Sequence, residues 1–358
     1  MSTTPRIIRP TRAVSWTPVD LALVANTGYQ IPTPSIGLVR NSPLGLFYAG
    51  KINSIFGDSG SGKSLFSLHL MAEEMKRGND VLLVDYEDNP GTHVGRLRQL
   101  GVSYEMILRH FIFIQPEEQW NSDAYARIDD ATKDRNISLA IVDSLGESMA
   151  CDRLSGNIDE DVAKWMRGLP KVLAATGAAV IVLDHVVKSV ETSRKSSFAS
   201  GSQRKRASLS GAAYFVEVVA APSKKSDGHF RLIARKDRHG HWDHDKVACD
   251  VFIRNREGNT IEVDVVLADP NTPRKFRPTH YMQRVSELVA EASEPMSKNQ
   301  IVIALGGHKT AIGVAIDRLV EDGFCSATNG PRNAQMISFV KAYTEGGDVV
   351  IPVNKDPF

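Results

Sequence analysis

The chain has 358 residues, of which 42% are hydrophobic and 24% charged, and its formal net charge is +1. This composition is typical of a globular protein of about two domains, and no run approaches the ~18 apolar residues that would span a bilayer. Because the net charge is small, any affinity for nucleic acid must come from local patches. Three scattered cysteines without metal-ligand spacing favour reduced thiols and a cytoplasmic location.

Residues 1–44 are rich in Pro, Thr and Ser, and we expect them to form an N-terminal arm. From 45 to 268, short apolar runs alternate with helical patterns, which predicts an α/β core built on a mostly parallel sheet. The last two runs have short connections containing Gly and are expected to be added strands. The six predicted strands are Ile52–Phe56, Val81–Val84, Leu139–Val142, Ala179–Leu183, Tyr214–Ala220 and Arg231–Ala234.

Residues 269–279 contain three prolines and are the predicted linker. From 280 to 345 the pattern changes to three helices and a hairpin, which predicts a small winged-helix domain, and 346–358 are the expected tail. The predicted features are a helix at Tyr281–Ala292, a capping box at Ser297 and Gln300, a third helix at Lys309–Asp322 ended by Gly323, and a turn at Asn329-Gly330.

A phosphate-binding P-loop follows the first predicted strand and opens a helix, which is the context that this motif requires. Its residues are Gly57, Asp58, Ser59, Gly60, Ser61, Gly62, Lys63 and Ser64. The glycines allow backbone N–H groups to surround phosphates at the positive end of the helix. Lys63 is expected to reach the β- and γ-phosphates of ATP, and the Ser64 hydroxyl to bind Mg²⁺.

Three other strands end in polar residues that would lie at the same sheet edge. Asp143 is the candidate for holding Mg²⁺, usually through water. Glu87 faces the γ-phosphate position and could polarise the attacking water, although a solvated acidic loop is the simpler interpretation because two aspartates flank it. Glu147 is the alternative base, at the position used by AAA+ ATPases. His185 could contact the γ-phosphate, although a lone His is more often structural.

These strand-end motifs, in this order, resemble the RecA-like ATPases, and in particular the RepA-like branch of the hexameric replicative helicases. Asp85-Tyr86-Glu87 matches the catalytic glutamate of that family, Val142-Asp143-Ser144 its Mg²⁺ aspartate, and His185 its polar sensor. The segment 235–240 resembles the Lys-x-Arg-x-Gly hairpin of DnaB-like helicases. The resemblance implies that Lys236 and Arg238 enter the neighbouring subunit's nucleotide site, although a solvated hairpin tip is the simpler interpretation.

Residues 188–210 are rich in Ser and strongly basic, with one acidic residue. In RecA-like proteins the loop at this place grips single-stranded DNA, and phosphate neutralisation needs such a cluster. A flexible, solvated loop is the alternative. In the winged helix, six Lys/Arg against seven Asp/Glu give a net charge of −1, so DNA contact and protein docking both stay open. The expected DNA-binding residues are Lys188, Arg194, Lys195, Arg204, Lys205, Arg206, Lys309 and Arg332.

The resemblance implies a ring-forming, DNA-stimulated ATPase, expected to be a hexameric helicase of phage or plasmid replication in a bacterium or a phage-infected cell. It is expected to act with primase or other replication proteins. Two features depart from the resemblance: we expect no primase-binding N-terminal helical domain of the DnaB-like kind, and a C-terminal winged helix is not part of the minimal helicase core. The alternatives are a non-unwinding ATPase that loads a helicase or mediates recombination, and a nucleotide-switched regulator that binds DNA through the winged helix.

Overall fold

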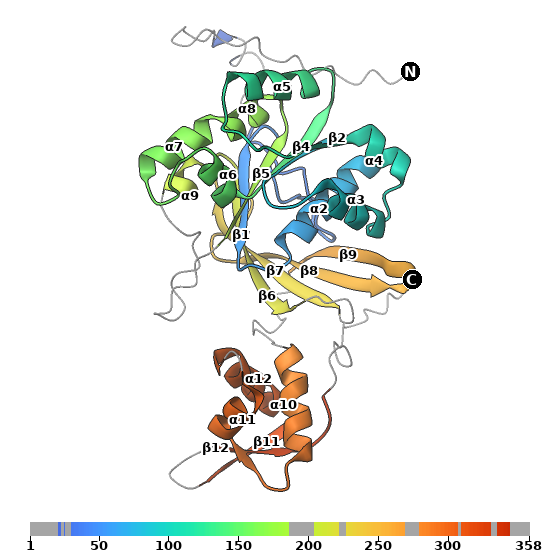
Figure 1. The fold of residues 1–358 in the computed structure, drawn as a ribbon, viewed down its shortest axis with the longest axis vertical. Coiled ribbons are helices and arrows are strands. Elements are labelled where there is room, and N and C mark those ends of the chain that lie inside the picture. The colour runs from blue at the N-terminus through green and yellow to red at the C-terminus, as the bar shows by residue number, and fades with distance from the viewer. Residues whose placement is uncertain are drawn as a thin grey trace. The chain divides into compact units, whose positions relative to one another are not determined.

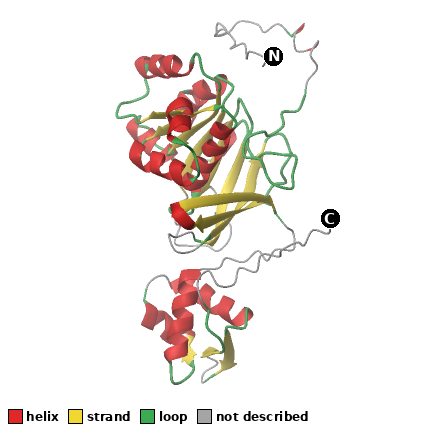
Figure 2. Cartoon of the chain, turned by 90° about the vertical axis from the view of Figure 1, so that its right-hand side faces the viewer, coloured by secondary structure: helices red, strands yellow, loops and turns green. Residues whose placement is uncertain are grey.

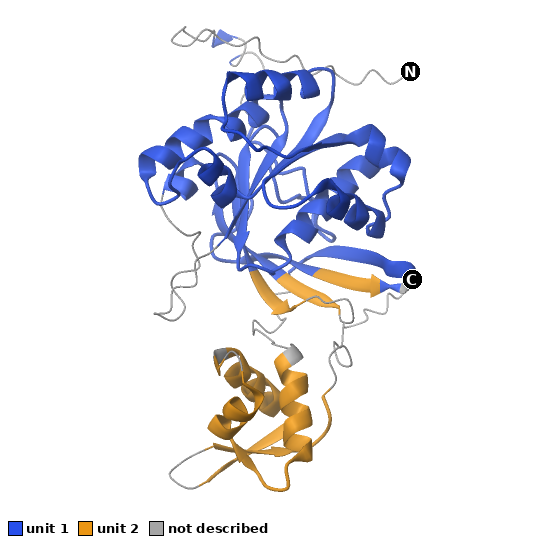
Figure 3. Ribbon diagram, viewed as in Figure 1, with its two compact units in different colours: residues 1–216, 231–251, 256–269 blue, residues 217–230, 252–255, 270–358 orange. Residues whose placement is uncertain are grey.

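The computed structural model describes residues 21, 22, 25, 30–185, 204–221, 227–268, 279–306, 309–330 and 335–343. The chain divides into two compact units (Figure 3). The first comprises residues 1–216, 231–251 and 256–269, and the second comprises residues 217–230, 252–255 and 270–358. No described helix has both the length and the apolar character needed to cross a membrane.

The core is organised around a nine-stranded sheet in the order β3-β2-β4-β5-β1-β6-β7-β8-β9 (Figure 1). The pairs from β3 to β6 are parallel, which confirms the predicted parallel core. Strands β3, β8 and β9 were not among the predicted strands. The strands are β1 (Ile52–Gly57), β2 (Asp80–Asp85), β3 (Phe111–Ile114), β4 (Ile137–Asp143), β5 (Ala179–His185), β6 (Ala212–Ala220), β7 (Gly228–Asp237), β8 (Val247–Arg256) and β9 (Thr260–Leu267).

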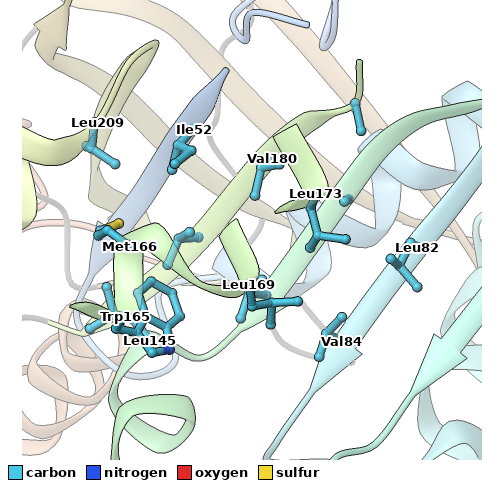
Figure 4. Close-up of a cluster of buried hydrophobic side chains, with 14 of the residues drawn as sticks. Ile52, Leu82, Val84, Leu145, Trp165, Met166, Leu169, Leu173, Val180 and Leu209 are labelled. Carbon is cyan, nitrogen blue, oxygen red and sulfur yellow. The ribbon is translucent and has the colours of Figure 1, made fainter. Parts of the chain in front are cut away.

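Helices lie on both sides of the parallel strands (Figures 1 and 2), so these strands are apolar on both faces. Residues such as Leu82, Val84 and Val180 pack on one face in a cluster with Trp165 and Leu169 (Figure 4). The helices of the core are α2 (Lys63–Lys76), α3 (Pro90–Gln99), α4 (Tyr104–His110), α5 (Ser122–Thr132), α6 (Leu145–Cys151), α7 (Asp159–Arg167), α8 (Leu169–Ala175) and α9 (Arg204–Ser208), with a 3₁₀ turn η1 at Glu257–Asn259.

The segment before Gly45 packs with this core. Ile36 and Val39 are buried, and Ile36 forms an antiparallel bridge with Phe47. The backbone of Arg40 exchanges hydrogen bonds with β9, accepting from Leu267 and donating to Val265. Core packing therefore begins at least nine residues before the predicted arm ends, because these apolar side chains gain a buried face.

The second unit contains α10 (Thr279–Glu291), α11 (Lys298–Leu305) and α12 (Lys309–Glu321), and a three-stranded sheet in the order β10-β12-β11. Its strands are β10 (Met296–Ser297), β11 (Cys325–Asn329) and β12 (Gln335–Phe339). The helices share a buried apolar cluster that includes Ile312 and Ile316. The capping box at Ser297 and Gln300 is present. These elements follow the order predicted for a winged helix, which remains a prediction.

The predicted two-residue turn at Asn329-Gly330 is wrong. Asn329 pairs with Gln335 across the hairpin, so five residues separate the paired positions. The reason lies in the next residue, Pro331, because proline has no N–H to donate to a ladder hydrogen bond.

Candidate functional site

The P-loop joins the end of β1 to the start of α2 and depends on its glycines. Gly60 and Gly62 have φ values of 75° and 91°, which residues with a Cβ atom rarely adopt. A Cβ atom on Gly57 would lie 3.1 Å from Cβ of Val216. The loop can therefore present its backbone N–H groups at the start of α2, where phosphate is favoured.

Lys63 is buried inside its own loop, with 5% of its surface exposed. Its Nζ donates to the carbonyl oxygens of Gly57 at 2.9 Å and Asp58 at 2.8 Å, and it lies 3.5 Å from Nδ1 of His185. Burial lowers the pKa of Lys63, an effect opposed by nearby carboxylates, first among them Asp143. A buried ammonium held by carbonyl oxygens fits a phosphate group, whose oxygens can replace those acceptors.

Ser64 and Asp143 place two oxygen ligands side by side. Ser64 Oγ donates to Oδ2 of Asp143 at 2.9 Å. Burial raises the pKa of Asp143 to about 6, Asp85 and Glu87 add to the rise, and the hydrogen bond from Ser64 opposes it. Mg²⁺ prefers oxygen ligands, so the Ser64 hydroxyl and the Asp143 carboxylate fit this cation when it is bound with nucleotide phosphates.

Glu87 lies at the same edge and touches two neighbouring strand ends. Its Oε1 accepts a 2.5 Å hydrogen bond from Ser144 Oγ and lies 3.6 Å from Nε2 of His185. Glu147, the alternative base, is exposed in the first turn of α6, and its backbone N–H lies 3.5 Å from Ser144 Oγ. The geometry thus places Glu87, rather than Glu147, beside the sensor position.

Sheet topology explains this convergence. Strands β2, β4, β5 and β1 are neighbours and parallel, so their carboxyl ends meet at one edge. The register pairs Asp85 with Asp143 and Gly57 with His185. Sequence reasoning missed Ser144 as a partner of Glu87. Its position directly after Asp143, at the end of a predicted strand, could have indicated that Ser144 belongs to the site.

Two of the predicted basic residues are engaged elsewhere. Lys205 is 8% exposed, and its Nζ lies 3.0 Å from Oδ2 of Asp184, so the prediction that it contacts DNA is wrong for this arrangement. Lys236 belongs to β7 rather than to a hairpin tip, because the strand continues to Asp237. Its Nζ donates to the carbonyl oxygens of Arg206 at 2.6 Å and Leu209 at 2.7 Å, which fixes the end of α9.

The other predicted basic residues differ in what the structure describes. Arg238, just beyond β7, is exposed, and so are Arg204 and Arg206 on the short helix α9. Lys309 is exposed at the start of α12. The remaining candidates lie outside the described residues; they are Lys188, Arg194, Lys195 and Arg332.

Comparison with known proteins agrees with this site. A family model described as an AAA domain matches residues 39–191. Protein RecA of Nitratidesulfovibrio vulgaris is 26% identical over 170 residues, which cover 45% of each chain. Protein RecA of Mesomycoplasma hyopneumoniae is 27% identical over 155 residues, covering 41% of this chain and 44% of that protein. Protein RecA of Desulfovibrio desulfuricans is 32% identical over 130 residues, covering 36% and 34%.

The chain contains a RecA-like P-loop ATPase domain. The matched region includes the P-loop and the ends of β2, β4 and β5, so the RecA-like resemblance noted from the sequence is confirmed at this level. The chain spans about half the length of the curated relatives it matches. Membership of this class implies nucleotide binding.

Proposed function

We propose that the chain is an ATP-dependent replicative DNA helicase, which hydrolyses ATP at the subunit interfaces of a ring, a hexamer, and so moves along single-stranded DNA. One observation carries the ATPase part of the proposal. Lys63, Ser64, Asp143, Glu87 and His185 come from four adjacent strand ends and meet at one sheet edge.

Each of these residues has its own role in the proposed hydrolysis of ATP. Lys63 and the loop N–H groups hold the β- and γ-phosphates. Ser64 and Asp143 would hold Mg²⁺, which would neutralise developing phosphate charge when bound. Glu87 orients a water molecule and accepts its proton as the water oxygen attacks the γ-phosphorus. The bond from that phosphorus to the β–γ bridging oxygen breaks, and ADP and phosphate leave. His185, between Lys63 and Glu87, then registers the loss of the γ-phosphate.

Arg238 supports hydrolysis at a subunit interface. Within the described residues, no hydrogen bond or ion pair engages its exposed guanidinium, and its backbone N–H donates to Gly211 at 3.3 Å. An arginine supplied by a neighbouring subunit stabilises charge on the transferring phosphoryl group. Lys236, which holds the end of α9, is a weaker candidate for that contact.

The DNA part of the proposal rests on the basic segment 188–210 and on the resemblance to helicases of the RepA-like branch. Arg204 and Arg206 remain exposed at the described end of this segment. Single-stranded DNA, further copies of the chain, and primase or other replication proteins are the proposed partners.

The second unit favours one other function, a nucleotide-switched regulator that binds DNA through a winged helix. Three helices and a hairpin are the required elements, and Lys309 is exposed at the start of the third helix, which would enter a DNA groove. The net charge of −1 over 280–345 fits a protein-docking role equally well.

Two measurements test the proposal. Glu87→Gln should bind Mg-ATP but lose hydrolysis by about 10²-fold or more, the upper part of the range for general bases, while Glu147→Gln should hydrolyse nearly normally. Exchanged phenotypes would place the base on α6 and contradict the RecA-like assignment of Glu87. Wild-type protein should also unwind a forked duplex with a 5′ tail. ATP hydrolysis without unwinding would favour a loader or mediator, and sequence-specific duplex binding would favour the regulator.

A further inference from the structure

The backbone that carries Glu87 is held by a buried carboxylate. Asp85, the last residue of β2, is 1% exposed. Its Oδ1 accepts hydrogen bonds from the backbone N–H of Glu87 at 2.7 Å and from that of Asp88 at 2.9 Å. The backbone N–H of Tyr86 donates to the Asp143 carbonyl at 2.7 Å. Three successive N–H groups around Glu87 are therefore fixed from within the sheet edge.

The other oxygen of Asp85 faces a buried histidine. His93 lies in α3 and is 2% exposed, with Nε2 2.7 Å from Oδ2 of Asp85. Neither ring nitrogen of His93 has a hydrogen-bond partner among the described residues, so the approach of Nε2 to Asp85 is a close polar contact without hydrogen-bond geometry. The ring also packs on Phe113 of β3, at 5.4 Å between centroids. The chain thus leaves β2 at Asp85, turns through Glu87, and returns to the same carboxylate at His93.

The burial of the Asp85 carboxylate and its place at the base of the Glu87 loop both indicate that the contact with His93 positions this loop. Removing a carboxylate from water is costly unless its oxygens are well satisfied, and here each oxygen has a partner on the loop or on the helix that follows it. The side chain of Glu87 is fixed independently, because Ser144 Oγ donates to its Oε1. The loop between β2 and α3 is therefore held at its base by Asp85 and His93, and at its tip by Ser144.

We infer that Asp85 and His93 are a positioning pair, which holds the Glu87 backbone at the distance from the γ-phosphate that water activation requires. The inference rests on the proposed role of Glu87 as the base. Among the described residues, no hydrogen bond or ion pair joins either member of the pair to the P-loop. Loss of the pair should therefore lower kcat and leave nucleotide affinity nearly unchanged. Displacement of a reacting group by about 1 Å can cost about 10²-fold in rate.

A matched control exists on the same strand. At the amino end of β2, Asp80 Oδ1 lies 2.9 Å from Nδ1 of His110, a second Asp–His pair at the end of the sheet away from the P-loop. His93→Phe and His110→Phe each keep a packing ring and remove the polar contact. Both changes affect the stability of the same strand, but only the first affects the Glu87 loop.

The experiment measures kcat for ATP hydrolysis, the Kd for fluorescent Mg-ADP, and thermal unfolding in the full chain. His93→Phe should lower kcat by about 10- to 100-fold with Kd within about threefold of wild type. His93→Gln, whose side-chain amide can place an N–H beside Asp85, should recover part of that loss, and His110→Phe should keep kcat near wild type. If His93→Phe unfolds, the milder variants His93→Gln and Asp85→Asn replace it. Their kcat and Kd are then compared with those of the control variants His110→Gln and Asp80→Asn.

The outcomes separate the two proposals. If Glu87→Gln is inactive but the changes at His93 and Asp85 lower kcat no more than those at His110 and Asp80, the positioning pair is refuted and the proposed function stands. If Glu87→Gln hydrolyses ATP normally, the assigned base is wrong and the inference fails with it. A rise in Kd equal to the fall in kcat would also overturn the inference, because it would show a general defect in the nucleotide site.

Discussion

Ser64 Oγ and Asp143 Oδ2 are 2.9 Å apart and joined by a hydrogen bond that links the P-loop helix to the end of β4. Two elements that lie 79 residues apart in the chain thus supply one pair of oxygens. Beside this pair, His185 lies between Lys63 and Glu87, with Nδ1 3.5 Å from Lys63 Nζ and Nε2 3.6 Å from Glu87 Oε1.

Asp143→Asn should therefore impair the use of Mg²⁺ more than the binding of nucleotide. The amide keeps the size of the side chain but loses the negative charge that favours a cation held through water. We expect kcat to fall by about 10²-fold and the Mg²⁺ concentration for half-maximal turnover to rise. A Mg²⁺ titration of ATPase activity checks this, with Asp80→Asn at the other end of the sheet as the control. An unchanged Mg²⁺ requirement would remove Asp143 from the metal site.

Lys205→Met should destabilise the core, although Lys205 lies within the strongly basic segment 188–210. Its loss leaves the buried Asp184 carboxylate without its partner, and breaking a buried ion pair typically costs about 3–5 kcal/mol. The matched change Lys171→Met, at an exposed lysine of α8, should alter stability by less than about 0.5 kcal/mol. All four tryptophans, at positions 16, 120, 165 and 242, precede the second unit's helices, so tryptophan fluorescence during denaturation follows the core. Equal stability of the two variants would contradict the buried pair.

The burial of Lys205 is an example of a feature that could not be predicted from the sequence. Strand ends and the P-loop could be predicted, because apolar runs fix the strands and parallel topology brings their carboxyl ends together. The burial of Lys205 depends on Asp184, 21 residues earlier, and nothing in the local pattern distinguishes it from exposed Arg204. Likewise Asp85 and His93 meet only because α3 returns to β2. Strand β3 could have been found, since the run Phe111–Ile114 is wholly apolar.

His69 should make the core sensitive to acid. Burial lowers its pKa from 6.5 to about 4, and Lys76 and Arg77 add to this, while Glu73 opposes it. Because the unfolded chain binds the proton more readily, this contribution to stability is complete above pH 6.5 and is lost as the pH falls towards 4. At pH 5 the loss amounts to about 1–2 kcal/mol, at about 1.36 kcal/mol per pKa unit and allowing for partial exposure.

The test compares wild type with His69→Gln by urea unfolding at pH 7.5 and pH 5, followed by tryptophan fluorescence. Other groups that titrate in this range affect both proteins alike, so the difference between them isolates His69. The wild type should lose about 1–2 kcal/mol more than the variant on acidification. Parallel losses in the two proteins would show that His69 is freely protonated in the folded state.

Variants of Arg238 test whether the chain assembles, because the proposed role of this arginine is at the nucleotide site of a neighbouring subunit. A guanidinium supplied in trans is worth on the order of 10³–10⁵ in rate in well-studied cases. Arg238→Ala should therefore keep nucleotide binding and lose most DNA-stimulated hydrolysis. Mixing gives the discriminating measurement, since Lys63→Ala subunits lack a working P-loop but retain the arginine. A mixed ring of the two variants contains interfaces with an intact Lys63 on one side and an intact Arg238 on the other, so part of the activity should return. Fully active protein that stays monomeric by light scattering during turnover would rule out both the trans arginine and the ring.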